Sequence, residues 1–161
     1  MFKSCHPIFR KRVTAFYIYT MGDRRRFQEM TRFVQRNYPR AENILCVADG
    51  KGDLAKLLTK SNFNCKIIDP VSLRHKQLDY ERKYFTRDYD SEDYDLILGL
   101  HPDHATAEII LNAKRLKKKF AIVPCCVLGD EAKGVGDYFN WLKKLKHLAN
   151  NQCRETNLPI K

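Results

Sequence analysis

A glycine-rich turn is the first group of residues in this 161-residue sequence whose types and spacing suit ligand binding. Gly50-x-Gly52-x-x-Ala55 follows an apolar run and satisfies the dinucleotide fingerprint, and Asp69 lies nineteen residues beyond Gly50. A carboxylate there can accept both hydroxyl groups of a ribose. A pyrophosphate would sit at the helix N-terminus, where Asp49 and Asp53 would repel it. The turn therefore favours a ligand with a ribose and no phosphate, such as S-adenosylmethionine, unless Asp53 only caps the helix and the glycines only make a turn.

Reactive side chains follow two later apolar runs, namely His101, Asp103, His104, Cys125 and Cys126. Two His and two Cys are zinc ligand types, but His-x-x-His at a turn and adjacent cysteines suit tetrahedral geometry poorly. Cys125 has a second interpretation as a nucleophile that attacks a pyrimidine ring. We prefer a third, in which no metal is bound, the cysteines pack beside the pocket, and His101 orients or deprotonates an acceptor hydroxyl or amine.

Strand-length apolar runs alternate with helical periodicity, and this alternation must position both groups. Strands are predicted at Asn43–Ala48, Cys65–Asp69, within Leu78–Thr86, at Leu96–Leu100 and at Phe120–Val123. Helices are predicted from a cap at Asp23 through Val34, through Leu54 to Leu58, over 103–117 and over Tyr138–Leu148, and the tail 151–161 can start one more strand. The alternation predicts βαβ units in a doubly wound, Rossmann-like α/β fold with a mostly parallel sheet, and ligands at the carboxyl ends of its strands.

The length and composition predict a single domain over residues 1–161. We divide it into a basic N-terminal segment and helix (1–40), a cofactor-binding core (41–126), and a C-terminal loop, helix and tail (127–161). No stretch approaches the roughly 20 apolar residues of a membrane span. The six cysteines lack a C-x-x-C spacing, which favours reduced thiols and a cytoplasmic location.

The formal charge of +11 is unevenly distributed. Residues 1–40 contain ten Lys or Arg and two acidic side chains, so +8 of the total lies there. We expect the basic stretches 10–36 and 114–119 to dock a polyanion such as RNA, with salt-dependent affinity. The alternative is an ordinary solvated surface.

Several of these segments together resemble a known family. Cys46-Val-Ala-Asp-Gly-Lys-Gly-Asp-Leu54, the strand-end Asp69, Gly99-Leu100-His101 and Pro124-Cys125-Cys126 resemble class I S-adenosylmethionine-dependent methyltransferases. Within that class they are most similar to a branch with a G-L-H motif after strand four and a C-C motif after strand five, which includes tRNA ribose methyltransferases. The resemblance covers roughly residues 40–126.

The resemblance implies a class I methyltransferase type of sheet with short or incomplete C-terminal strands, and S-adenosylmethionine as cofactor. It implies that Gly50 and Gly52 line the methionine moiety, that Asp69 holds the ribose, that the segment near Thr86 to Asp88 approaches the adenine, and that Gly99 to Pro102 form a floor beside the methyl group. The predicted cofactor-binding residues are thus Asp49, Gly50, Gly52, Asp53, Asp69, Pro70, Gly99 and Leu100, with His101 as the catalytic residue.

Two departures from the family pattern support a second hypothesis. Ala48 stands where the first motif usually has an acid, and Pro102-Asp103-His104 replaces the Cys-Gly that follows G-L-H in related sequences. The main hypothesis is a methyltransferase that acts on RNA. The alternative is a catalytically degenerate member that serves as a binding or interaction module.

Overall fold

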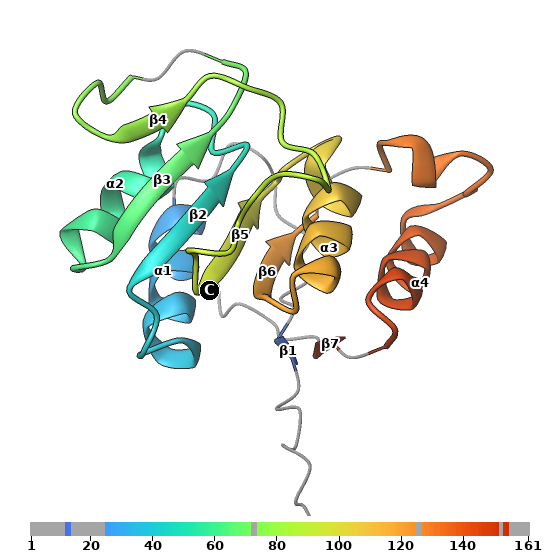
Figure 1. Cartoon of the computed structure of the whole chain (residues 1–161). Coiled ribbons are helices and arrows are strands. Elements are labelled where there is room, and N and C mark those ends of the chain that lie inside the picture. Colours follow the sequence, from blue (N-terminus) through green and yellow to red (C-terminus); the bar gives the residue numbers. More distant parts are fainter. Residues whose placement is uncertain (1–11, 14–24, 72–73, 125–126, 152, 155–161) are drawn as a thin grey trace, which may run out of the picture.

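A single parallel sheet organises the chain in the computed structural model, which describes residues 12–13, 25–71, 74–124, 127–151 and 153–154. Its strands are β2 (Asn43–Val47), β3 (Asn64–Ile68), β4 (Asp79–Glu81), β5 (Leu96–Leu100) and β6 (Lys119–Val123). They lie in the order β4-β3-β2-β5-β6, and every neighbouring pair is parallel. The carboxyl ends of all five strands therefore form one edge of the sheet (Figure 1).

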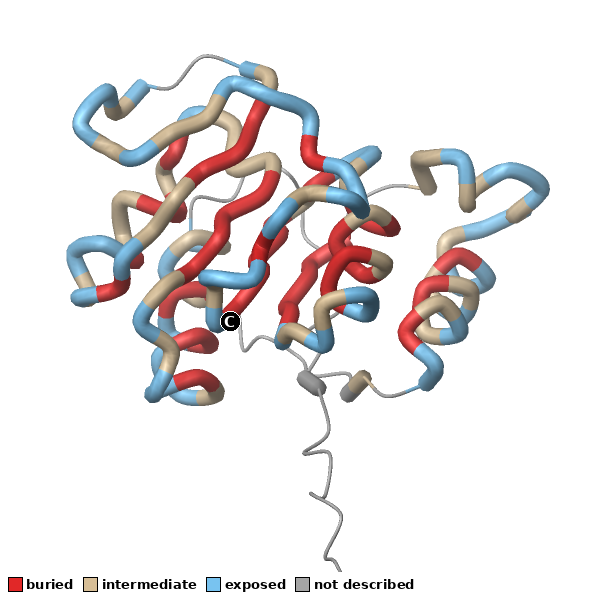
Figure 2. Tube along the Cα trace, in the orientation of Figure 1, coloured by how far each residue is buried: buried red, intermediate tan, exposed pale blue. Residues whose placement is uncertain are grey.

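Helices cover both faces of this sheet. The helices α1 (Arg25–Asn37) and α2 (Asp53–Lys60) pack on one face, and α3 (Ala105–Arg115) and α4 (Tyr138–Leu148) pack on the other. The central strands are buried along their length, as Figure 2 shows. Burial on both faces is what a parallel sheet with crossover helices requires, and it explains why these strands read as continuous apolar runs.

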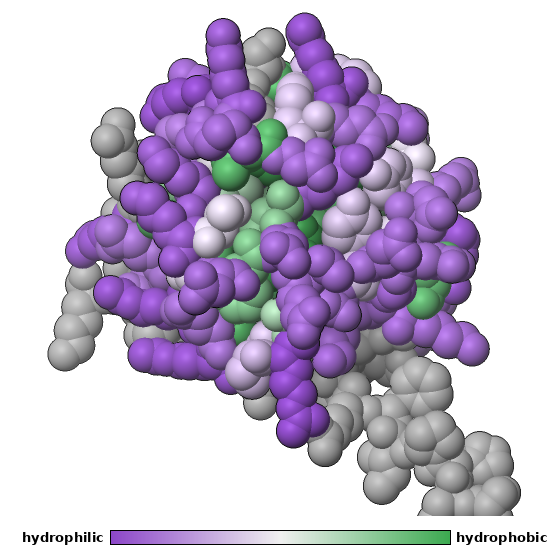
Figure 3. Space-filling model, turned by 60° about the vertical axis from the view of Figure 1, so that its left-hand side comes forward, coloured by the Kyte–Doolittle hydropathy of each residue, from purple (hydrophilic) through white to green (hydrophobic). Residues whose placement is uncertain are grey.

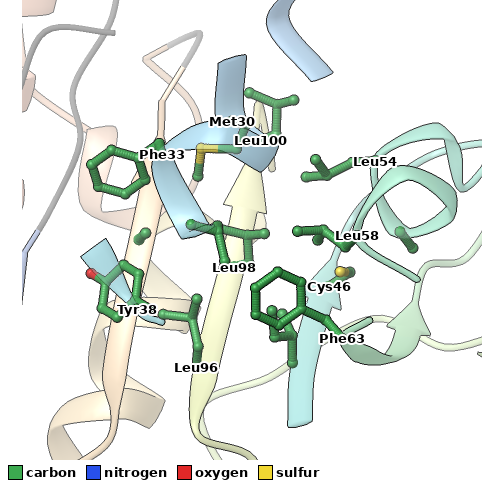
Figure 4. Close-up of a cluster of buried hydrophobic side chains, with 14 of the residues drawn as sticks. Met30, Phe33, Tyr38, Cys46, Leu54, Leu58, Phe63, Leu96, Leu98 and Leu100 are labelled. Carbon is green, nitrogen blue, oxygen red and sulfur yellow. The ribbon is translucent and has the colours of Figure 1, made fainter. Parts of the chain in front are cut away.

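Successive residues of β2 and β5 contribute to opposite cores. Cys46 and Leu98 pack with α1 and α2, whereas Leu45 and Ile97 pack with α3 and α4. Figure 4 shows the first core, where Met30 of α1 lies close to β5 and Leu58 of α2 closes the other side. On the face in Figure 3, hydrophilic side chains surround a small central apolar area.

The doubly wound α/β fold predicted from the sequence is confirmed, and its boundaries differ at a few places. The first strand ends at Val47 because Ala48 takes a left-handed backbone with φ 54°. The helix predicted over 103–117 spans Ala105–Arg115, because Asp103 and Lys117 also have positive φ. The cap predicted at Asp23 lies outside the described residues.

The C-terminal strands are short, as predicted. A 3-10 helix η1 (Asp130–Ala132) precedes α4, and β7 (Cys153–Arg154) pairs in parallel with β1 (Arg12–Val13) in a separate two-stranded sheet. Pairing with residues so early in the chain was not predicted. No helix among the described residues is long and apolar enough to cross a membrane. Among these residues, Cys46, Cys65 and Cys153 are free thiols.

Candidate functional site

A cleft of about 1220 Å³ opens at the carboxyl edge of the sheet. Its walls come from the turns after β2, β3 and β5, the first turn of α1, and the loop 127–133. The chain leaves β2 toward β3 and β4 on one side, and returns to β5 and β6 on the other. The cleft therefore lies at the topological switch point, which is where open α/β sheets bind ligands.

The glycine turn adopts a backbone that other residues rarely tolerate. Gly50 and Gly52 have φ of 62° and 81°, and Ala48 just before them is left-handed as well. The N–H of Gly50 donates to Oδ2 of Asp69 at 2.7 Å. Gly50 lines the cleft, whereas Gly52 is the N-cap of α2 and does not contact it. The turn is thus held open by its backbone conformation and by a carboxylate from the neighbouring strand.

Asp49, which lines the cleft, satisfies the first N–H groups of α2. Its carboxylate accepts from the N–H of Ala55 at 2.8 Å and of Leu54 at 3.3 Å. The pKa of Asp49 is raised to about 7, mainly by burial and to a smaller extent by the charges of Asp53 and Asp69, while the two N–H donors oppose the shift. The alternative in which Asp53 caps this helix is wrong, since no side chain caps it from the N-cap position.

The carboxylate of Asp53 contacts two side chains, the ring of His75 and the guanidinium of Arg74. Its Oδ1 lies 2.9 Å from Nε2 of His75, and its Oδ2 lies 3.6 Å from the guanidinium of Arg74. Because Arg74 offsets the charge of Asp53, and Asp49 is half-protonated near neutral pH, the turn does not carry two free negative charges. This corrects the premise that Asp49 and Asp53 would repel a phosphate.

Asp69 is buried, with 4% of its surface exposed, and it joins two loops. Besides the N–H of Gly50, it accepts the N–H of Val71 at 2.7 Å. A carboxylate has about four acceptor sites, so two remain for a ligand. Asp69 and Pro70 both line the cleft, which is compatible with the predicted place of the ribose.

His101 follows β5 in the same cleft and has an unusual environment. Its φ is 57°, its N–H donates to the carbonyl of Val123 at 2.9 Å, and neither ring nitrogen has a hydrogen-bond partner among the described residues. Burial lowers its pKa below 6.5, the charge of Arg26 lowers it further, and Asp103 opposes the shift. Both ring nitrogens are buried, and a neutral imidazole has one unprotonated nitrogen, which is able to accept a proton from a substrate that reaches it.

Gly99 and Leu100 precede His101 on β5. Leu100 lines the cleft, and Gly99 does not. A Cβ at Gly99 would lie 2.7 Å from Cδ1 of Ile109 and 2.9 Å from Cγ of Pro102. Gly99 therefore lets α3 and the turn after β5 pack against the strand, a role that the sequence did not indicate.

The zinc and cysteine hypotheses find no support in the described residues. No group of three or more His, Cys, Asp or Glu side chains there is arranged to hold a metal. His104 is exposed at the wall of the cleft. Cys125 and Cys126 lie outside the described residues.

Several lining residues were missed as site residues, among them two pairs that contain an aromatic ring. Arg26 and Phe27 enter from the first turn of α1, and Tyr84 and Phe85 from the segment after β4, where Tyr84 is 75% exposed. Thr86 to Asp88, where the resemblance places the adenine, do not line the cleft. Tyr84 and Phe85 directly follow two exposed cationic residues in the sequence, and this pattern could have indicated them as site residues.

Arg87 instead joins three segments behind the cleft wall. Its guanidinium pairs with Glu108 of α3 and lies 3.0 Å from Oε1 of Glu131 in η1. Its N–H also donates to Glu108 at 2.6 Å. These bonds hold the loop 127–133 against the cleft.

Comparisons with known proteins add little beyond the geometry. No protein-family model and no curated protein matches the chain. It is similar to the sugar N-methyltransferase KedS8 of a Streptoalloteichus species, with 14% identity and a TM-score of 0.48 over 77% of this chain and 59% of that one. It is also similar to the plantazolicin methyltransferase BpumL, solved with a desmethylPZN analog and SAH, with 16% identity and a TM-score of 0.47 over 76% of this chain and 56% of that one. The chain spans less than two thirds of either structure.

Proposed function

We propose that this chain is an S-adenosylmethionine-dependent methyltransferase. The observation that carries the proposal is one cleft, at the switch point between β2 and β5, that collects the glycine turn, Asp69 and His101. These groups supply a backbone that a ligand can approach, acceptors for a ribose, and a base.

The charges of the cleft suit a cationic cofactor. Seven carboxylate side chains and four Lys or Arg side chains line it. The carboxylates are Asp49, Asp53, Asp69, Asp103, Glu108, Asp130 and Glu131, and the cations are Arg26, Lys51, Arg74 and Lys133. S-adenosylmethionine bound there would supply a methyl group on a positively charged sulfur. Asp53, Glu108, Asp130 and Glu131 have Arg or Lys partners, so the attraction depends mainly on the remaining carboxylates, and Asp69 has acceptor sites left for the ribose hydroxyls.

His101 is the residue that we expect to handle the proton. With S-adenosylmethionine bound, an oxygen or nitrogen of the acceptor would take the methyl group as the carbon–sulfur bond breaks, and His101 would accept the proton that the acceptor loses. The low pKa of His101 keeps the imidazole neutral at pH 7, so its unprotonated ring nitrogen can accept a proton. Most of the rate would still come from positioning.

We further propose RNA as the acceptor. The charge of +8 on residues 1–40 and the place of Arg26 in the cleft wall support an anionic substrate that approaches along α1. The lysine-rich stretch 114–119 gains less support as a docking site. Lys118 and Arg115 donate to the carbonyls of Glu92 and Tyr89, and Lys119 begins β6 at the edge opposite the cleft.

Calorimetry with S-adenosylhomocysteine tests the cofactor. We expect binding at one site, and weaker binding of an analogue without the two ribose hydroxyls. No heat at several hundred micromolar ligand would refute the proposal. Asp69→Ala is a poor test, because it also removes the acceptor of the Gly50 and Val71 N–H groups.

Methyl transfer is tested with a labelled methyl donor and total cellular RNA. His101→Asn should keep cofactor affinity and lower the transfer rate by roughly 10²-fold or more, because Asn tolerates the left-handed backbone but is no base. An unchanged rate would show that His101 is not the base.

One observation favours the degenerate module as a second candidate. Both oxygens of Asp69 already accept backbone N–H groups, and the side chain is almost fully buried. A protein that binds RNA and not S-adenosylhomocysteine would fit this candidate.

A further inference from the structure

The helix α1 has one apolar face and one cationic face. Its buried side chains include Met30, Phe33 and Val34, which pack onto the sheet, and Figure 4 shows Met30 and Phe33 beside β5 and β6. At about 100° per residue, the exposed Arg25, Arg32 and Arg36 lie within about 40° of one another on the opposite face. We call these three residues the arginine row.

The arginine row starts at the cleft. Arg26 and Phe27, in the same first turn as Arg25, line the cleft wall. From Arg25 to Arg36 the row extends roughly 17 Å, at 1.5 Å per residue. The exposed Arg40 follows after the helix ends. A chain lying on this row would thus have one end at the mouth of the cleft.

The far end of the row differs from the cations around the cleft in its ion pairing. Arg74 and Lys133 pair with Asp53 and Asp130. On α1, Glu29 pairs with Arg32, and the described residues provide no ion pair for Arg36 or Arg40. An exposed guanidinium group such as that of Arg36, which has no ion pair among the described residues, suits the oxygens of a phosphate group, which it can bind in a bidentate manner.

We propose that the arginine row binds the phosphate backbone of a single-stranded RNA and leads one nucleotide into the cleft. This proposal depends on the proposed function for what happens to that nucleotide. A single strand is required because only an unstacked nucleotide can enter a cleft to reach His101. At the mouth, the exposed ring of Tyr84 offers a face on which a base can stack, which an acidic peptide would not use.

The test compares two pairs of substitutions that remove the same charge. Arg32→Gln/Arg36→Gln shortens the row, and Lys60→Gln/Lys143→Gln removes two exposed lysines from α2 and α4. The probe is a fluorescently labelled, mixed-sequence 12-nucleotide RNA, and its affinity is measured by anisotropy between 50 and 300 mM NaCl. Circular dichroism and thermal unfolding verify that both variants fold.

We expect the row variant to lose roughly tenfold or more in affinity at 50 mM salt, and its salt slope to fall by about 1.4, at 0.7 per phosphate contact. The lysine variant should change less than about twofold. Equal losses in both variants would indicate diffuse attraction and overturn the proposal. So would a wild-type protein that does not bind the RNA, or polyglutamate that competes as well as unlabelled RNA.

Calorimetry with S-adenosylhomocysteine on the same proteins separates this proposal from the proposed function. If the row variant loses RNA affinity although the wild type binds no S-adenosylhomocysteine, the row is supported and the methyltransferase is refuted. If S-adenosylhomocysteine binds and the two variants bind RNA alike, the arginine row is refuted and the cofactor site of the proposed methyltransferase is supported.

Discussion

His101 combines a left-handed backbone, a half-buried ring and ring nitrogens that have no hydrogen-bond partner among the described residues. Left-handed backbone at non-glycine residues stores strain and concentrates at functional sites. Ala48, His101 and Asp103 all have positive φ, and they follow the two strands that flank the switch point. The protein thus tolerates this strain where its ligand would bind.

The ionisation of His101 should respond in opposite directions to its two charged neighbours. Its pKa is below 6.5 in the folded protein. Arg26→Gln removes a cation and should raise the pKa, whereas Asp103→Asn removes an anion and should lower it. NMR titration of the ring proton measures both shifts. A change in the same direction in both variants would contradict the assigned causes.

Asp49 should make stability depend on pH. In the unfolded chain its carboxyl ionises near 3.8, and in the folded chain only near 7, so the folded state holds one more proton between these values. Stability from this group is therefore lost as pH rises through that window. Relative to Asp49→Asn, the wild type should lose about 2 kcal/mol of unfolding free energy between pH 5 and pH 7. Urea titrations of both proteins at both pH values measure this difference. An equal loss of unfolding free energy in the wild type and in Asp49→Asn would refute the role of Asp49.

Tyr84 should contribute to ligand binding although it is exposed. Tyr84→Ala should weaken S-adenosylhomocysteine or RNA binding by about 1 kcal/mol through lost ring contacts. Phe139→Ala is the matched control, since Phe139 is 68% exposed on α4 and does not line the cleft. Calorimetry and anisotropy measure the two ligands. Equal effects of the two variants would exclude a specific role for Tyr84.

At the scale of elements, the contact between β5 and α3 depends on the missing side chain of Gly99. Gly99→Ala forces a Cβ within 3 Å of Ile109 and Pro102 and should destabilise the fold by about 1–3 kcal/mol. Gly136→Ala is the control, because a Cβ there meets nothing within 4 Å. Thermal and urea unfolding measure both. A Gly99→Ala protein as stable as the control would show that α3 adjusts freely.

The segments around the cleft are joined by side chains rather than by the sheet. Asp69 connects the glycine turn to the loop after β3, and Arg87 connects the segment after β4 to α3 and η1. The strands alone would align the turns, and these carboxylates and guanidinium groups hold them in place.

At the scale of the whole molecule, opposite charges lie on adjoining surfaces. Acidic side chains outnumber basic ones in the cleft, and the arginine row leads up to it. S-adenosylmethionine has one more positive charge than S-adenosylhomocysteine. Raising NaCl from 50 to 500 mM should therefore weaken S-adenosylmethionine more than the product. Parallel calorimetric titrations measure this, and an identical salt response would show that the acidic lining does not act on the ligand's charge.

Most of the fold was predictable because burial on both faces makes each central strand a continuous apolar run. The runs at 43–48, 96–100 and 120–123 are visible without any structure. The pairing of β7 with β1 was not predictable, since two-residue strands leave no periodicity. The end of β2 and the start of α3 differ from the prediction because Ala48 and Asp103 have left-handed backbone, which their residue types do not indicate.

The sequence by itself determined the order of the elements, the place of the glycine turn and of His101 at strand ends, and the concentration of charge in residues 1–40. Those properties follow from apolar periodicity and from composition, which are local. Only the tertiary structure decided which charges remain free. Asp53 and Arg74 offset each other, burial raises the pKa of Asp49 to about 7, and Arg36 has no acidic partner among the described residues. Such pairings depend on distances between side chains across the fold. Coulomb energy depends on these distances, and the spacing of residues in the sequence does not determine them.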